Sequence, residues 1–223
     1  ILSNLKSNID YGVFEIGMDK KGEIENLSKL VKPEIAIITN IAGAHFKNFN
    51  TLKDIAKAKA EIINNIPKGG NIVLNKDSKF FRLLSRKAKK NGINITSFSL
   101  KRKSDIFLLG IKKIKNFFRL KINVRNKIFF FDIKYSTDNF INNILACIST
   151  IFILNLDLSK IKKNFISFKI PEGRGDIKII KKFNKRFKFI DESYNANPLS
   201  MISAIKNMNY YNGNKSHRKL VFL

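Results

Sequence analysis

Cysteine, tryptophan, acidic residues and long hydrophobic runs are all scarce in this chain. The single cysteine, Cys147, has no partner for an internal disulfide, which favours a reducing compartment. The longest apolar stretch, 144–156, is interrupted by polar residues and is too short to span a bilayer. No signal segment is recognisable at the start of the sequence. We therefore expect a cytoplasmic protein with no membrane partner.

The shortage of acids leaves a strong positive charge. The 223 residues include 43 Lys and Arg against 17 Asp and Glu, which gives a formal net charge of +26. Clustered cations are typical of nucleic-acid binders, but here the lysines are spread from Lys6 to Lys219, and arginine is scarce. Lys, Asn, Ile and Phe are all abundant, as expected from an AT-rich genome. We therefore favour compositional bias and expect no nucleic-acid partner, although an acidic nucleotide substrate would benefit from the positive field.

The hydrophobic content of 44%, with 20 Phe, is sufficient for a folded core. In the first hundred residues, short apolar runs alternate with segments of helical periodicity. This alternation predicts a mostly parallel sheet with helices on both faces, an α/β fold. The predicted strands are 13–16, 35–39, 72–74 and 93–97, and the predicted helices are 23–31, 51–66 and 79–90.

The second half of the chain has a different pattern. Three consecutive strand-like runs, 106–111, 117–124 and 127–134, predict a small antiparallel meander, and a helix over 137–154 follows. The turn residues of 171–175 indicate a linker. Beyond the linker we expect strands at 177–180 and 187–190, a helix over 198–209 and the start of a strand at 219–223.

Polar groups follow the first two predicted strands. Glu15 ends the first strand, Asn40 follows the second, and His45 lies in the loop after it. Ligands of open parallel sheets gather at the carboxyl ends of the strands, and a carboxylate with an imidazole suits Mg²⁺ or Mn²⁺ better than a closed zinc site. Taken singly, Glu15 and His45 fit solvent-exposed side chains better. Taken together, they leave a metal site and a solvated edge as open alternatives.

Lys59 is the most informative residue of the predicted helix 51–66. At about 100° per residue, the apolar side chains of this helix fall within about 60° of Lys59. Lys57 points to solvent, and Glu61 lies on the opposite side or flank. A charged amine on an apolar face costs several kcal/mol unless it is paired or changes its state. Lys59 therefore extends to the helix edge, pairs with a phosphate, or has a chemical function.

Six sequence blocks occur in an order and spacing that point to one family. They are 15–24 (EIGMDKKGEI), 33–45 (PEIAIITNIAGAH), 58–62 (AKAEI), 138–146 (DNFINNILA), 171–174 (PEGR) and 191–198 (DESYNANP). Together they resemble the Mur ligase family of ATP-dependent amide ligases. The resemblance implies a central ATP-binding domain over 1–175 and the start of a Rossmann-like C-terminal domain over 176–223.

The resemblance also implies roles for the residues around the first two strands. Glu15 and His45 fall where the family holds Mg²⁺. Lys59 falls on the catalytic lysine that CO₂ carbamylates in relatives, which converts a buried cation into a carboxylate-like metal ligand. Thr39 and Asn40 fall beside the phosphates or the substrate.

Further residues fall on nucleotide positions of the family. Asn139 and Asn142 fall at adenine-binding positions, and Arg174 falls on a nucleotide-contacting arginine. Either Asp191 or Glu192 falls on a carboxylate that contacts the ribose or the domain hinge. The resemblance thus implies ATP and Mg²⁺ as cofactors.

The last block is similar to that of the members that join D-alanyl-D-alanine to UDP-N-acetylmuramoyl-tripeptide through an acyl phosphate, as monomeric enzymes of peptidoglycan precursor synthesis. Two departures stand against it: Asp138 replaces the family's His, and no Gly-x-x-Gly-Lys-Thr phosphate loop is present. We expect that both ends are truncated and that this chain alone is inactive. The alternatives are another amide ligase of the superfamily (another muramoyl-peptide ligase or a folylpolyglutamate ligase), a basic nucleic-acid-binding module, and an inactive α/β remnant.

Overall fold

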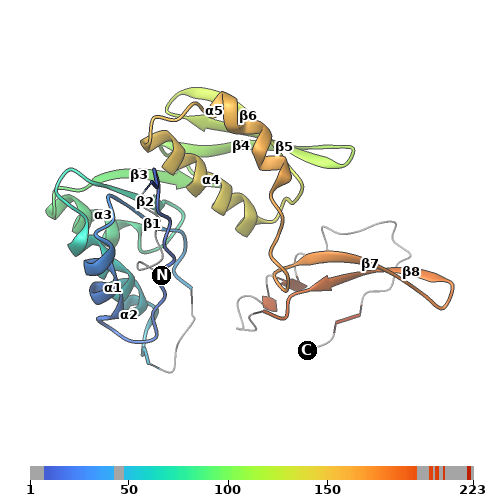
Figure 1. Cartoon of the computed structure of the whole chain (residues 1–223), viewed down its shortest axis with the longest axis horizontal. Helices are drawn as coiled ribbons and strands as arrows, with labels where there is room; N and C mark the ends of the chain where they lie inside the picture. The colour runs from blue at the N-terminus through green and yellow to red at the C-terminus, as the bar shows by residue number, and fades with distance from the viewer. Residues whose placement is uncertain are drawn as a thin grey trace.

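Six strands form one mixed sheet in the computed structural model, which describes residues 8–42 and 48–194 together with 201, 202, 204, 205, 208, 220 and 221. The strands are β1 (Ile35–Ile38), β2 (Asn71–Asn75), β3 (Asn94–Ser99), β4 (Ile106–Ile114), β5 (Phe117–Val124) and β6 (Lys127–Ile133). They lie in sequence order; β1 to β4 run parallel and β4 to β6 antiparallel (Figure 1). One sheet therefore contains both the parallel part and the meander that the sequence predicted.

Helices cover both faces of the parallel strands. They are α1 (Glu23–Val31), α2 (Leu52–Lys59), α3 (Phe81–Lys90), α4 (Asp138–Ile153) and α5 (Leu158–Ile161), with two 3₁₀ helices, η2 (Ala60–Asn65) and η3 (Lys162–Ser167). Ile72 and Leu74 of β2 belong to the core under α1, α2 and α3, whereas Val73 between them belongs to the core under α4. This alternation is that of a strand buried on both faces, so the predicted α/β architecture is confirmed.

The predicted helix 51–66 is present, but its second half is wound more tightly. A capping box begins α2: the Asp54 N–H donates to Thr51 Oγ1 at 3.2 Å, and the Thr51 N–H donates to Asp54 Oδ2 at 3.1 Å. The α-helix α2 ends at Lys59, and the 3₁₀ helix η2 begins at the next residue, Ala60. Side chains after Lys59 therefore leave the 100° phase that the sequence analysis assumed.

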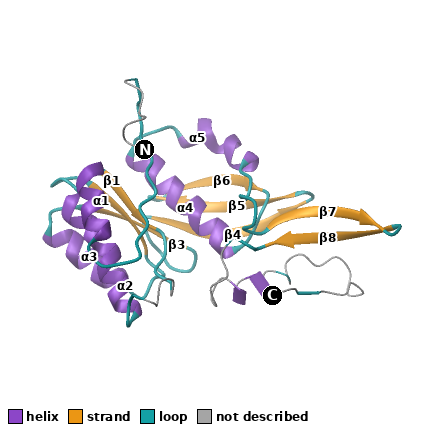
Figure 2. Cartoon of the chain, turned by 60° about the horizontal axis from the view of Figure 1, so that its bottom comes forward, coloured by secondary structure: helices purple, strands orange, loops and turns teal. Residues whose placement is uncertain are grey.

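The antiparallel strands pack one face against α4 and η3. Leu120, Ile122 and Phe131 are fully buried there. Phe165 of η3 meets Phe131 edge-on, with 5.0 Å between the ring centroids. Helix α4 lies across β2, β3 and β4 (Figure 2), so it ties the parallel and antiparallel parts of the sheet together.

A separate two-stranded antiparallel sheet follows the linker. It consists of β7 (Asp176–Lys182) and β8 (Lys185–Asp191), which confirms the two strands predicted beyond 171–175. In both Figure 1 and Figure 2 the turn between these strands points away from the helices. Most of the predicted helix 198–209 and of the predicted strand at 219–223 lies outside the described residues.

The predicted strand at 13–16 is wrong. Residues 11–18 have no regular secondary structure, and Val13 is 96% exposed. Among the described strands β1 pairs only with β2, so this segment pairs with no described strand, while Ile16 and Met18 pack on the core under α1. An apolar run becomes a strand only where a neighbour accepts and donates the backbone hydrogen bonds, and the sequence pattern does not contain that information.

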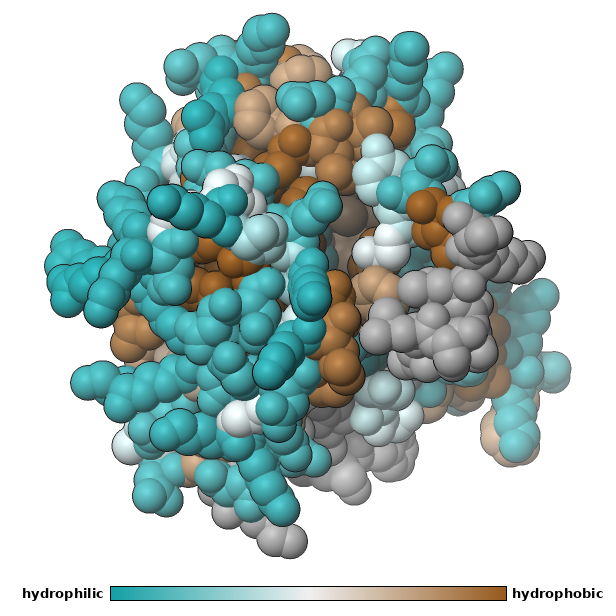
Figure 3. Space-filling model, turned by 60° about the vertical axis from the view of Figure 1, so that its left-hand side comes forward, coloured by the Kyte–Doolittle hydropathy of each residue, from teal (hydrophilic) through white to brown (hydrophobic). Residues whose placement is uncertain are grey.

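The surface is mostly hydrophilic on the side of α1, α2 and α3, with apolar side chains visible between the charged ones (Figure 3). Within the described part of the chain, no helix combines the length and the apolar character that a bilayer crossing requires.

Candidate functional site

The carboxyl ends of β1 and β2 meet the amino-terminal half of α4. Asn75, the last residue of β2, is 9% exposed, and its Nδ2 donates to the Thr39 carbonyl at 3.3 Å and to Asn142 Oδ1 at 3.5 Å. Asn75 Oδ1 in turn accepts the Asp77 N–H at 2.8 Å. The amide of Asn142 is thereby held at the edge where open parallel sheets bind their ligands.

Asp77 links the ends of β2 and β3 at the same edge. Its carboxylate accepts the Ser99 hydroxyl and the Leu100 N–H, both at 2.7 Å. The fully buried Ser99 hydroxyl also accepts the N–H groups of Lys101 and Arg102, at 3.0 and 2.7 Å. The loops after β2 and β3 therefore form one hydrogen-bonded platform, joined to Asn75 through the Asp77 N–H.

Asn40 and Asn139 lie at the surface of this edge. Asn40 follows Thr39, and its Oδ1 accepts the Ile41 N–H at 2.8 Å. Asn139 is exposed in the first turn of α4, one turn before Asn142 and on the same helix face. The structure thus brings Thr39 and Asn142 together through Asn75, and it places the other two predicted amides beside them in the chain.

Lys59 is half-buried at the end of α2, whereas Lys57 is exposed, as the helix phase predicted. Burial lowers the pKa of the Lys59 amine. None of the carboxylates in the described part of the chain forms an ion pair with this amine. The amine is therefore shifted toward its neutral, nucleophilic form without an acidic partner.

Glu61 is buried, and the expectation that it lies on the solvent side or flank of the helix is wrong. Its Oε1 and Oε2 accept the Gly22 N–H at 2.9 and 3.0 Å, and Oε2 accepts the Glu25 N–H at 3.3 Å. The tighter winding of η2 changes the direction of Glu61, and the free N–H groups at the start of α1 favour a carboxylate. Glu61 therefore fastens α1 to the segment that carries Lys59.

The described part of the chain does not assemble the predicted metal set of Glu15, His45 and Lys59. Glu15 is exposed on the irregular segment before α1, and His45 lies outside the described residues. Within the ranges that the structure describes, no three His, Cys, Asp or Glu side chains gather into a group that could hold a metal ion. The set of Glu15, His45 and Lys59 therefore remains a prediction.

Arg174, Asp191 and Glu192 come together where the linker meets the β7–β8 hairpin. The Gly175 N–H donates to the Asp191 carbonyl at 2.6 Å. The Arg174 guanidinium lies 4.2 Å from the ring centroid of Tyr194. Among the described residues, no hydrogen bond or ion pair joins this cluster to the Asn75 network.

The two neighbouring acids of this cluster have different acidities. Hydrogen bonds from the side chain and the backbone N–H of Ser193 lower the pKa of the Asp191 carboxyl. Desolvation raises the pKa of the Glu192 carboxyl, and the negative charges of Asp191 and Asp176 act in the same direction. Asp191 therefore keeps its negative charge to lower pH than Glu192 does.

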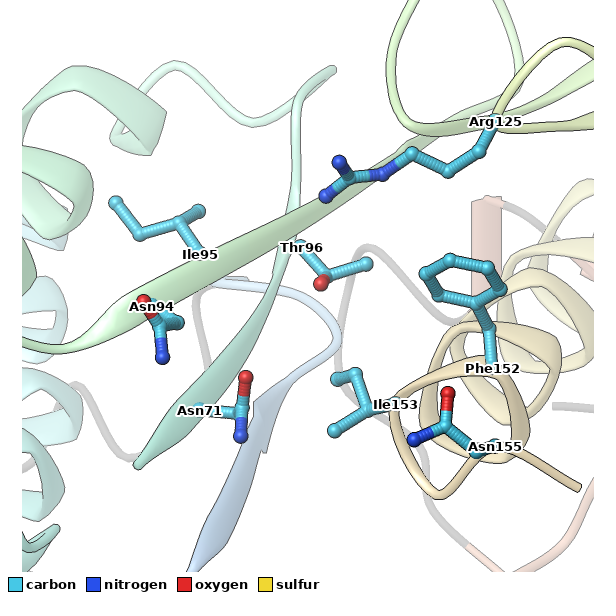
Figure 4. Close-up of a pocket in the computed structure, with 8 residues that line it drawn as sticks. All are labelled: Asn71, Asn94, Ile95, Thr96, Arg125, Phe152, Ile153 and Asn155. Carbon is cyan, nitrogen blue, oxygen red and sulfur yellow. The ribbon is translucent and has the colours of Figure 1, made fainter. Parts of the chain in front are cut away.

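A cavity of about 360 Å³ opens at the opposite, amino-terminal edge of the sheet (Figure 4). Its walls include Asn71 and Asn94, the first residues of β2 and β3. Phe152, near the end of α4, lies on the other side, with the Arg125 guanidinium 5.7 Å from its ring centroid. None of the predicted site residues that the structure describes lines this cavity. Because it lies at the amino-terminal ends of the parallel strands, it is separate from the carboxyl edge, where open parallel sheets bind their ligands.

Sequence reasoning missed Asn75 and Asp77 as members of the edge. The signal was available: Asn75 directly follows the apolar run 72–74, Asp77 lies two residues further on, and the same rule had singled out Asn40. Glu61 was named only as a residue of the polar side. Its contact with α1 joins positions 39 residues apart, and the helical period does not predict such a contact.

A parallel sheet covered on both faces, with hydrogen-bonding side chains at its carboxyl edge, defines the class of open α/β nucleotide-binding domains. Within that class, the family profile described as Mur ligase middle domain matches residues 1–151. The chain therefore belongs to the Mur ligase family.

Curated relatives cover nearly the whole chain. A ligase of Rickettsia prowazekii is 32% identical over 206 residues, which are 92% of this chain and 45% of that protein. One of Buchnera aphidicola subsp. Baizongia pistaciae is 34% identical over 216 residues, which are 96% of this chain and 45% of that protein. Both are named UDP-N-acetylmuramoyl-tripeptide–D-alanyl-D-alanine ligase. The chain thus spans less than half the length of these relatives.

Solved structures show the same fold. A crystal structure of MurF from Acinetobacter baumannii superposes with a TM-score of 0.84 at 28% identity, over 95% of this chain and 45% of that one. MurF from Thermotoga maritima, solved in complex with ADP, has a TM-score of 0.72 at 23% identity over 88% of this chain and 45% of that one. The sheet and its helices are therefore those of Mur ligases.

Proposed function

We propose that the full-length protein joins D-alanyl-D-alanine to UDP-N-acetylmuramoyl-tripeptide in an ATP-dependent step of peptidoglycan precursor synthesis. The observation that carries this proposal is the run of relatives bearing that ligase name, which are 31% to 34% identical over at least 92% of the chain. Because the chain spans less than half of each of them, the activity and the substrates belong to the whole protein.

The proposed reaction has two steps. The terminal carboxylate of the tripeptide attacks the γ-phosphorus of ATP, forming an acyl phosphate and releasing ADP. The amine of D-alanyl-D-alanine then attacks the acyl carbon, so that a C–N bond forms, phosphate leaves and the amine loses a proton. Phosphoryl transfer of this kind depends mainly on positioning and charge neutralisation, which a rigid, polar sheet edge supplies.

ATP would lie at the carboxyl edge of the parallel strands. Asn142 and Asn139 would contact the adenine, and Asn40 would lie near the phosphates or the substrate. Support comes from the hydrogen bond that fixes Asn142 beside the end of β2. Arg174 with Asp191 or Glu192 would complete the nucleotide site from the linker side. The lowered pKa of the Asp191 carboxyl favours it as the ribose acceptor.

Lys59 would act as a carbamate. The neutral amine adds to CO₂, forming an N–C bond and losing a proton, so a half-buried cation becomes an anion with two oxygen atoms. The lowered pKa of the amine favours the neutral form that this step needs. Together with Glu15 and His45, such a carbamate gives the oxygen-rich donor set that suits Mg²⁺. When bound, Mg²⁺ neutralises charge on the phosphate oxygens.

The organisation of the chain follows from the same proposal. Residues 1–175 would form the central ATP-binding domain, and residues 176–223 would begin the C-terminal domain, whose closure would bring in the amine. The start of the separate β7–β8 sheet at Asp176 supports this boundary. We further propose a cytoplasmic, monomeric enzyme.

The test is ATP consumption by the full-length protein. It should require both UDP-N-acetylmuramoyl-tripeptide and D-alanyl-D-alanine, whereas other amino acids or peptides should not replace the dipeptide. Lys59→Ala should lower turnover by about a hundredfold or more, because a metal ligand contributes several kcal/mol to the transition state. Short carboxylic acids should restore part of the activity by replacing the carbamate.

The matched control is Lys57→Ala, on the same helix but exposed. It removes the same charge and should leave turnover within about twofold. Equal activity of the Lys59→Ala variant and the unchanged protein would contradict the carbamate. Turnover with a dipeptide other than D-alanyl-D-alanine would instead assign the chain to another ligase of the family.

A further inference from the structure

The β7–β8 hairpin carries cations along its whole length. They are Lys178, Lys181, Lys182, Lys185, Arg186 and Lys188, with no acid between Lys178 and Ile190. Its acids, Asp176 and Asp191, lie opposite each other at the base. Lys178 forms ion pairs with Glu172 and Asp176, but within the described residues the other five cations form none. The outer half of the hairpin is therefore a concentrated and uncompensated positive charge.

Like charges face each other across the two strands. Lys181 pairs in register with Arg186, and Lys182 with Lys185. Directly opposed like charges destabilise an antiparallel pair, so this arrangement does not serve the stability of the hairpin. A negatively charged surface placed against the turn would remove the repulsion.

The turn itself presents an apolar ring. Phe183 is 83% exposed, and both Phe183 and Asn184 have positive φ, 53° and 55°. This two-residue turn favours Gly or Asn, and a bulky side chain there is strained. A ring that is strained and unburied adds nothing to folding. Phe183 belongs to the turn between β7 and β8, and this turn points away from the helices (Figures 1 and 2), which suits contact with another body.

We propose that the tip of the β7–β8 hairpin, residues 181–186, docks on the surface of a bilayer that contains anionic lipids. The phenyl ring of Phe183 enters the headgroup region, and the surrounding cations meet the lipid phosphates. No membrane span is needed for this contact, and the proposal departs from the expectation of no membrane partner.

The chemistry of the tip favours lipid over nucleic acid. Five of the six cations of the hairpin are lysines, which act as point charges, whereas base edges are read mainly by arginine. Ile179, 59% exposed on β7, gains from an apolar environment but cannot stack on bases as an aromatic ring does. Lys182 Nζ lies 5.2 Å from the ring centroid of Phe183, so a cation already accompanies the ring at the tip.

The experiment is co-sedimentation of the full-length protein with vesicles of phosphatidylcholine, with or without phosphatidylglycerol. Binding should require phosphatidylglycerol and should fall as salt is added. The double variant Lys182→Gln/Lys185→Gln should weaken binding roughly 25-fold, since each lysine near an anionic surface contributes about fivefold. Phe183→Ser should weaken it by roughly tenfold and leave its salt dependence unchanged.

The matched control is Lys89→Gln/Lys90→Gln, which removes the same charge from the exposed end of α3. It should change binding by less than about threefold. Equal loss in both double variants, or binding to pure phosphatidylcholine, overturns the proposal. The same proteins are also tested for binding to an RNA oligomer. If the unchanged protein binds RNA but no vesicles, and the tip variants lose the RNA binding, the tip is a nucleic-acid site and the proposal is overturned. Ligase turnover should stay within about twofold in all these variants, so a failure of this proposal is distinguished from a failure of the proposed function.

Discussion

At the scale of single residues, Lys59 combines a half-buried amine with a position among isoleucines and alanines. Burial lowers the pKa of the amine below its ordinary value of 10.5. The unfolded chain therefore binds a proton at Lys59 more tightly than the folded chain does. The resulting destabilisation is fully present below the folded-state pKa, and it disappears as the pH rises from that value through 10.5.

The direction of this pKa shift predicts how the stability of a Lys59→Met variant depends on pH in buffer freed of CO₂. The thioether side chain has similar length and carries no charge to desolvate, so the variant should be more stable than the unchanged chain at neutral pH. The difference should shrink as the pH approaches and passes 10.5. Urea denaturation across this range measures it. A difference that grows with pH would contradict a desolvated amine.

At the scale of elements, the joint between α1 and η2 depends on Glu61. Its carboxylate accepts the Gly22 and Glu25 N–H groups in a buried position. Glu61→Ala should lower the free energy of unfolding by about 2–3 kcal/mol, because it leaves these N–H groups without an acceptor. Glu61→Gln, which keeps an acceptor oxygen, should cost less. Chemical denaturation of both variants measures the difference.

Glu34→Ala is the control for this joint, because Glu34 is exposed and, among the described residues, its side chain forms no hydrogen bond with α1. It should change stability by no more than about 0.5 kcal/mol. If Glu61→Ala were equally mild, the hydrogen bonds to α1 would carry no net stability.

The elements show which parts of the fold the sequence specifies. The periodicity of 23–31 gave the bounds of α1, and the apolar runs of 35–39 and 72–74 located β1 and β2. The prediction that Lys59 lies on the apolar side of its helix was also correct, because the α-helical phase holds up to the last residue of α2. These features depend on local periodicity, which one sequence contains.

Other features depend on contacts between distant segments. The run at 13–16 has the composition of a strand, yet no described strand pairs with it and Val13 is exposed. The Asn75 amide binds groups from β1 and α4, 36 and 67 residues away in sequence. Such contacts follow from how the elements pack, and the order of residues along one element does not define them.

At the scale of the whole molecule, the net charge of +26 acts on stability as well as on partners. Self-repulsion of the cations disfavours the compact state, and added salt screens it. Raising NaCl from about 20 mM to about 300 mM should therefore raise the melting temperature by about 3 °C. Calorimetry at the two salt concentrations tests this. A melting temperature that falls with salt would mean that the ion pairs, such as Arg119 with Asp132, outweigh the repulsion.

Helix α4 has a mechanical consequence for the molecule. Its 16 residues form one continuous helix about 24 Å long. One end carries Asn142, which Asn75 links to Thr39, and the other carries Phe152, whose ring lies 5.7 Å from the Arg125 guanidinium of the antiparallel part. We therefore expect a shift of the meander to move α4 as a unit and to change the spacing between the Asn142 amide and the end of β1.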